Sequence, residues 1–107
     1  MKISLVYMTI DSHKAAEDLG KKLIEENLAA CVNILPGMTS FYRWQGEIET
    51  AAETVIIAKT RTSLIDRLTS RVKSLHSYTI PCVVAVPIDG GNPDFLNWIE
   101  QETATPE

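Results

Sequence analysis

The segment from residue 29 to residue 49 constrains the fold of this chain more than any other. It opens with the strand-like run Ala29–Ile34, is interrupted by Pro36–Gly37, and continues as the aromatic strand Phe41–Trp44. Gln45–Gly46 then turns the chain into a second strand. A β-ribbon of this length exceeds what a small domain covers with its own residues, and uncovered strands attract further strands. We therefore expect a partner, and the simplest partner is another copy of the chain.

Size and composition predict one globular domain over residues 1–107, with a frayed tail from about residue 103. Apolar residues make up 45% and charged residues 22%, which is typical of globular proteins. The net charge is −4, the pI is near 5.1, and no basic run occurs. Nucleic acids and anionic membranes are held first by cation–phosphate contacts, so neither is an expected partner. No apolar run reaches the length of a membrane span.

The two cysteines bear on the compartment. Cys31 and Cys82 both lie in apolar strand-like runs rather than in turn-rich loops. A disulfide framework needs more cysteines and an oxidising environment, so we interpret both as reduced thiols. The N-terminus enters a strand within a few residues and shows no secretory leader. The sequence therefore predicts a cytoplasmic protein.

Hydrophobic periodicity defines the expected elements. Asp11 or Ser12 caps the first helix, Asn27 ends it, and Asn92–Pro93 opens the last helix. Pro81 precedes a strand that Pro87 closes. The expected strands cover about 3–9, 30–43, 47–60 and 82–86, and the expected helices cover about 12–27, 63–75 and 92–102.

This order of elements is that of an α+β, ferredoxin-like split βαβ sandwich with an antiparallel sheet (βαββαβ) and an added C-terminal helix. The run Val55–Ala58 is apolar at every position, which indicates a strand that is covered on both faces or lies centrally in the sheet. Helices on one face of the sheet leave the other face bare. Covering about 400 Å² of apolar surface per protomer would contribute on the order of 10 kcal/mol before association costs. Cyclic self-assembly is therefore expected.

No catalytic motif is present. The sequence lacks the nucleophile elbow, the phosphate-binding loops, the zinc-protease motif and the paired-cysteine motif. No nucleophile and base stand in an evident pair. We therefore expect that the protein is not an enzyme and has no obligatory cofactor.

A candidate ligand cleft follows from the second ribbon strand. Glu53 and Lys59 are six residues apart, so an extended strand places both on one face. With the aromatic residues Tyr42, Trp44 and Tyr78 they could line an intersubunit cleft for a small polar ligand or anion. The alternative interpretation of Lys59 and Glu53 is an ion pair at a subunit interface.

Metal ligation is the other chemistry that the residue types allow. The candidate ligands are those with sulfur, imidazole or carboxylate groups: Met8, His13, Cys31, Glu47, Glu49, Glu53, His76 and Cys82. Sulfur with imidazole favours copper or zinc. No two strong ligands stand at helical spacing, and the cysteines also fit as small core residues. His76, just past a helix end, fits equally well as a ligand and as a histidine favoured by the helix dipole.

Dispersed residues along the whole chain resemble the CutA divalent-cation tolerance proteins. They are Ala29–Ile34, Pro36–Gly37, Ser40, Tyr42, Trp44, Gly46, Ile48, Glu49, Glu53, Lys59–Thr60, His76, Tyr78, Pro81, Pro87–Ile88, Gly91, Leu96 and Trp98. The resemblance implies a ferredoxin-like homotrimer, similar in architecture to the nitrogen-regulatory PII proteins, that binds copper or another divalent ion. The alternative is a PII-like sensor that binds a small anion or metabolite between subunits.

The resemblance also points to a metal site, with departures. Some members have as proposed copper ligands a cysteine near the end of the first strand and two adjacent histidines before a Tyr-x-x-Pro segment. This chain has Met8 at the first position and Leu75–His76 at the second, and it has Cys82 where many relatives have glutamate. The expected metal ligands are therefore His76, Met8 and Cys82. Cys31 is expected to be a strand residue beside an interface.

Overall fold

The structure, a computed structural model, describes residues 2–104. Its elements follow the expected order. They are β1 (Ile3–Ile10), α1 (His13–Glu25), β2 (Cys31–Trp44), β3 (Glu47–Arg61), the 3-10 turn η1 (Thr62–Leu64), α2 (Ile65–Leu75), β4 (Val83–Ile88) and α3 (Pro93–Gln101).

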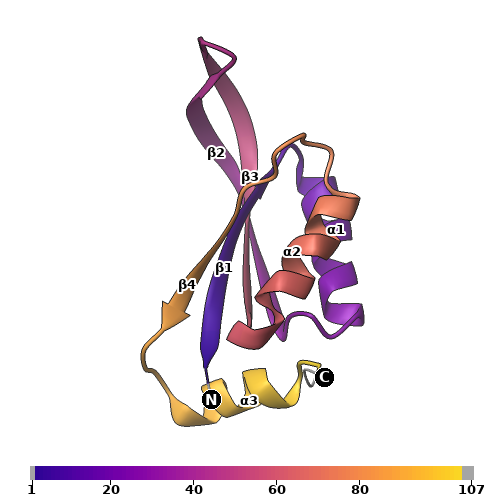
Figure 1. The fold of residues 1–107 in the computed structure, drawn as a ribbon, viewed down its shortest axis with the longest axis vertical. Coiled ribbons are helices and arrows are strands. Elements are labelled where there is room, and N and C mark those ends of the chain that lie inside the picture. Colours follow the sequence, from indigo (N-terminus) through magenta and orange to yellow (C-terminus); the bar gives the residue numbers. More distant parts are fainter. Residues whose placement is uncertain (1, 105–107) are drawn as a thin grey trace.

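The four strands form one antiparallel sheet in the order β2-β3-β1-β4. This confirms the α+β, ferredoxin-like arrangement expected from the sequence. Helices α1 and α2 lie together on one side of the sheet, and α3 lies at the end of the sheet near the start of β1 (Figure 1). The opposite side of the sheet has no cover from α1 or α2.

The helix boundaries follow from local chemistry. The Ser12 hydroxyl accepts a hydrogen bond from the Ala15 N–H at 3.1 Å, which caps α1. Asn27 ends that helix with a positive φ of 58°. At α3, the Asn92 side chain accepts from the Asp94 N–H at 3.0 Å, and Pro93 occupies the first turn.

The hydrophobic core lies between the sheet and the pair α1 and α2. Alternate positions of β1 and β3, among them Val6, Met8 and Ile56, are fully buried there. Leu23 of α1 and Leu68 of α2 complete the layer and are also fully buried. The chain's own helices therefore bury the helix-facing side of the sheet.

The ribbon expected from the sequence extends beyond the rest of the molecule (Figure 1). Pro36–Gly37 does not end the strand, because β2 continues through a bulge between Leu35 and Met38, where Gly37 has φ 81°. Gln45 and Gly46 have φ values of 50° and 84° and form a two-residue turn of the kind that suits the twist of a hairpin. We call residues 38–53 the arm.

Two boundaries differ from the sequence prediction. Pro87 does not close β4, which continues to Ile88; β4 is an edge strand, where proline is tolerated because only one side pairs. The expectation of a frayed tail was wrong for Thr103 and Ala104. Thr103 is buried, and the Ala104 N–H donates to the Asn27 carbonyl at 2.7 Å. Residues 105–107 lie outside the described residues. None of the described helices is long and apolar enough to cross a membrane.

Candidate functional site

The sheet face that α1 and α2 leave uncovered, which we call the open face, carries Lys59 and Glu53 of the expected cleft. Side chains alternate between the two faces of a strand, so strand register defines this face. One row of paired positions is Cys31, Lys59, Leu5 and Val86, the next is Asn33, Ile57, Tyr7 and Val84, and further rows are Leu35, Val55 and Thr9, then Met38 and Glu53.

The middle of the open face is apolar and reaches solvent. The side chains of Leu35, Val84 and Val86 are each exposed to about half, at 53%, 52% and 50%. On the arm, Phe41 and Ile48 are exposed at 74% and 69%. Exposed large apolar side chains gathered on a folded chain mark an interaction site.

Lys59 occupies the end of the open face that lies near α3. Its ammonium donates to the Asn33 side-chain oxygen at 2.7 Å and lies 3.8 Å from the Cys31 sulfur. The same Nζ lies 5.9 Å from the centre of the Phe95 ring, within the range of a cation–π contact. Sequence reasoning missed Asn33 and Phe95. Asn33 was detectable, since it lies two residues along the same strand face from Cys31.

Glu53 occupies the other end of the open face, at the base of the arm. Tyr78 donates its hydroxyl hydrogen bond to Glu53 Oε2 at 2.8 Å, and only 8% of Glu53 is exposed. Partial burial of the phenol, followed by the hydrogen bond to Glu53, raises the pKa of Tyr78 above its ordinary value. Met38 pairs with Glu53 across the ribbon and accepts a hydrogen bond from the Tyr7 hydroxyl.

His76 holds the segment that carries Tyr78. Its Nδ1 accepts a hydrogen bond from the Tyr78 N–H at 3.0 Å. The neutral ring therefore carries its proton on Nε2, which donates to the Thr9 carbonyl at 2.8 Å. The His76 and Tyr78 ring centres are 4.6 Å apart. Both ring nitrogens thus tie the segment after α2 to the end of β1.

The expected metal ligands lie in different environments. Met8 is fully buried in the core on the helix-facing side, both nitrogens of His76 are hydrogen-bonded, and Cys82 is a free, partly buried thiol. No three of the histidine, cysteine and acidic side chains within residues 2–104 are arranged to hold a metal ion. The set of His76, Met8 and Cys82 stays a prediction. It requires Met8 to leave the core and His76 to release a hydrogen bond.

The five residues expected in one cleft are distributed over the molecule. Glu53 and Tyr78 contact each other. Lys59 lies six residues farther along β3, a distance of about 20 Å in an extended strand. Tyr42 and Trp44 lie on the arm, paired with Glu49 and Glu47. One chain therefore presents two separate ends of a face rather than one cleft.

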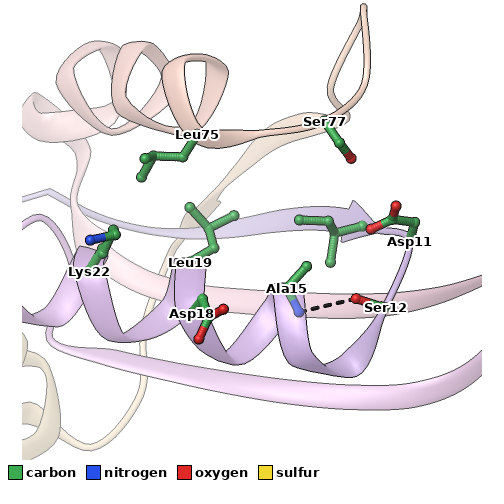
Figure 2. Close-up of a pocket in the computed structure, with 9 residues that line it drawn as sticks. Asp11, Ser12, Ala15, Asp18, Leu19, Lys22, Leu75 and Ser77 are labelled. Carbon is green, nitrogen blue, oxygen red and sulfur yellow. Dashed lines mark hydrogen bonds between the residues drawn. The ribbon is translucent and has the colours of Figure 1, made fainter.

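A pocket of about 350 Å³ lies between α1 and the end of α2. Figure 2 shows Leu19 of α1 and Leu75 of α2 facing each other across it. Two of its polar residues already have partners, because Ser12 caps α1 and Asp18 pairs with Lys14 at 2.9 Å. None of the expected site residues lines this pocket.

Comparison with known proteins identifies the family. A family model described as CutA1 divalent ion tolerance protein matches residues 4–102. The chain belongs to the CutA1 family. This confirms the resemblance found in the sequence, and it covers the sheet, all three helices and the arm.

Relatives from distant organisms share this chain's sequence. The divalent-cation tolerance protein CutA of Thermus thermophilus is 48% identical over 99 residues, which are 92% of this chain and 96% of that protein. The corresponding CutA protein of Archaeoglobus fulgidus is 45% identical over 92% of this chain and 95% of its own length. The rice protein CutA 1, chloroplastic, is 48% identical, but this chain spans only 56% of its length.

Solved CutA1 structures share the fold. The structure of the Thermus thermophilus protein has a TM-score of 0.93 with 46% identity, covering 95% of this chain and 99% of that one. The crystal structure of CutA1 from Oryza sativa has a TM-score of 0.97 with 44% identity, covering 99% and 97%. The agreement extends over almost every described residue.

Proposed function

We propose that this CutA1-family protein is a non-enzymatic homotrimer that binds copper or another divalent metal ion and contributes to tolerance of such ions. The observation that carries the proposal is the agreement in sequence and fold with proteins named for divalent-cation tolerance, which extends over nearly the whole chain. The absence of a catalytic motif from the sequence supports a non-enzymatic role.

The open face and the arm support self-assembly. Half-exposed aliphatic side chains cover the middle of the open face, and aromatic and aliphatic side chains cover the arm. Burying about 400 Å² of such surface on each protomer would contribute on the order of 10 kcal/mol. Two different surfaces, a face and an arm, suit head-to-tail contacts, which close into rings.

Metal binding would act through the segment after α2. His76 and Cys82 flank this segment, and imidazole with thiolate is a donor set that suits copper. A metal on His76 must displace either the Tyr78 N–H from Nδ1 or the proton on Nε2 that the Thr9 carbonyl accepts. Binding should therefore loosen the Tyr78 segment, and it should weaken as pH falls because protons compete for the imidazole.

A copper titration of the purified, tag-free protein tests this proposal. We expect a stoichiometric site with a Kd of about 1 μM or tighter, which His76→Ala and Cys82→Ser both weaken at least tenfold. His13→Ala is the matched control, since His13 is an exposed histidine on α1. Binding that is weaker than micromolar, or that is unchanged in His76→Ala, would contradict the proposed metal role.

A sensor for a small anion is the second candidate function. It is favoured by Lys59, whose ammonium has no carboxylate partner among residues 2–104. A thermal-shift screen with small carboxylates and nucleotides tests it. A ligand at 100 times its Kd should stabilise the protein by about 2.7 kcal/mol, and Lys59→Met should abolish that shift. A screen with no shift would remove this candidate.

The cytoplasmic location is also part of the proposal. It rests on the free cysteines, Cys31 and Cys82, because unpaired thiols are typical of a reducing compartment. The names of some relatives refer to other compartments. The rice and Arabidopsis proteins are called chloroplastic, and the Archaeoglobus protein is called periplasmic. Cell fractionation in the source organism tests the location, and recovery with an organelle or the periplasm would contradict it.

A further inference from the structure

Two opposite charges lie at the two ends of the open face, and neither has an ionic partner among residues 2–104. Lys59 and Glu53 both belong to β3 and share its open side. Three ion pairs occur among residues 2–104, and all of them lie on the helices or the turn after α1. Lys59 and Glu53 take part in none of them.

The ammonium of Lys59 is held in place but not neutralised. Asn33 accepts one of its hydrogen bonds at 2.7 Å, and the Phe95 ring lies 5.9 Å away. An ammonium has three donors, so donors remain for another acceptor. The side chain is partly buried, which favours a fixed orientation. The Lys59 ammonium is therefore oriented to bind a carboxylate.

The carboxylate of Glu53 is likewise held in place but not neutralised. Only 8% of the residue is exposed, and Oε2 accepts its hydrogen bond from the neutral Tyr78 hydroxyl. Every buried side-chain nitrogen and oxygen among the described residues has a hydrogen-bond partner, whereas Oε1 of Glu53 has none within residues 2–104. Oε1 therefore reaches the surface. A carboxylate so nearly buried is strongly stabilised by a cation placed at that surface.

The two charges cannot meet within one chain. Six residues of extended strand separate them by about 20 Å. Between them the open face carries apolar side chains, including Val55, Ile57 and Val84. Each copy therefore offers a cation to one neighbour and a carboxylate to the other, as a head-to-tail contact requires.

We propose that Lys59 of one copy forms an ion pair with Glu53 of the next copy around the homotrimer. This pairing rests on the homotrimer proposed above. In a head-to-tail ring each interface contains one such pair, and the apolar side chains beside it exclude water. Exclusion of water strengthens the pair and makes an unpaired or mismatched charge there unfavourable. The pair therefore also selects the register of the two chains.

Charge reversal with a swap tests the pair. We expect Glu53→Lys and Lys59→Glu each to raise the concentration at which the trimer dissociates by about 30-fold or more, the effect of about 2 kcal/mol. The double variant, which exchanges the two charges, should recover at least tenfold of that loss. The control combines Lys21→Glu with Glu25→Lys on the exposed side of α1 and should change the dissociation concentration less than twofold.

Milder variants keep the test valid if a reversed charge prevents folding. Lys59→Met and Glu53→Gln should show non-additive effects, with a coupling of at least tenfold in a double-mutant cycle. Tyr78→Phe removes the hydrogen bond to Glu53 within the chain and should leave that coupling in place. Additive effects of Lys59→Met and Glu53→Gln would overturn the ion pair.

Failure of the pair and failure of the homotrimer are distinguishable. A wild-type protein that stays monomeric would contradict the homotrimer itself. A wild-type trimer without coupling would leave the homotrimer intact and overturn the pair. Acetate or citrate that stabilises the wild-type trimer, but not Lys59→Met, would show that a free carboxylate occupies Lys59, and this would also overturn the pair.

Discussion

Ile56 and Ile57 are neighbours in β3, yet they lie in opposite environments. Ile56 points to α1 and α2 and is fully buried, whereas Ile57 points to the open face, in the same row as Tyr7 and the half-exposed Val84. The residue is isoleucine at both positions because each face of β3 packs against a different layer. The chain supplies the first layer with its own helices. In the proposed homotrimer, the second layer comes from another copy.

The contrast shows what an uninterrupted apolar strand means in a small domain. Burial on both faces is the usual interpretation of such a strand. In this fold the monomer fully buries the core residues of the helix-facing side, whereas Val84 and Val86 on the open face stay half exposed. In the proposed homotrimer, this remaining hydrophobicity belongs to the assembly rather than to the core. Mutations on the two faces should therefore change different equilibria.

The largest effect on folding is expected from the helix-facing side. Ile56→Ala removes a fully buried side chain from the core and leaves a cavity. The free energy of unfolding should fall by about 3 kcal/mol. Urea denaturation at a fixed protein concentration measures it. A loss below about 1 kcal/mol would mean that the core does not depend on this face.

A smaller effect on folding, with a large effect on assembly, is expected from the open face. Val84→Lys places a charge on a side chain that is half exposed in the monomer. Unfolding of the monomer should change by less than about 1 kcal/mol, because such surface sites tolerate substitution. The trimer should be lost at micromolar concentration. Light scattering measures the mass, and a stable trimer of Val84→Lys would remove this residue from the interface.

The smallest effect is expected at the base of the arm and depends on pH. The pKa of Tyr78 is raised in the folded chain, so the folded chain keeps a proton that the unfolded chain releases above about pH 10. The contribution is complete below that pH and is lost as pH rises further. Wild type should therefore lose more stability than Tyr78→Phe between about pH 9 and pH 11. Equal losses in urea denaturation would contradict the raised pKa.

Much of the fold was predictable because local signals determine it. Ser12, Asn27 and Asn92 act at the helix ends as their side chains suggest. The errors arose where tertiary context decides. Pro36–Gly37 is a bulge rather than a break because β3 continues to pair beyond it, and Thr103 is buried because Arg61 donates to it at 3.0 Å. The sequence around Thr103 does not indicate this contact, because Arg61 is distant in the chain.

The common face of Glu53 and Lys59 was predictable from the sequence, but the contacts around these two residues were not. Strand alternation places Glu53 and Lys59 on one face, as the structure does. The separation of about 20 Å also follows from their spacing, so one small ligand cannot contact both in the same chain. The hydrogen bond from Tyr78 to Glu53 depends on the path of the segment after α2. Periodicity carries no information on that path.

The most direct test of the central claim is the molar mass of the wild-type protein in solution, measured by light scattering across micromolar concentrations. If copies of the chain cover the open face, the mass should be about 36 kDa, three times the 11.9 kDa of one chain, and should not change on dilution. A mass of 11.9 kDa throughout that range would contradict the account, because the apolar open face would then lie bare in water.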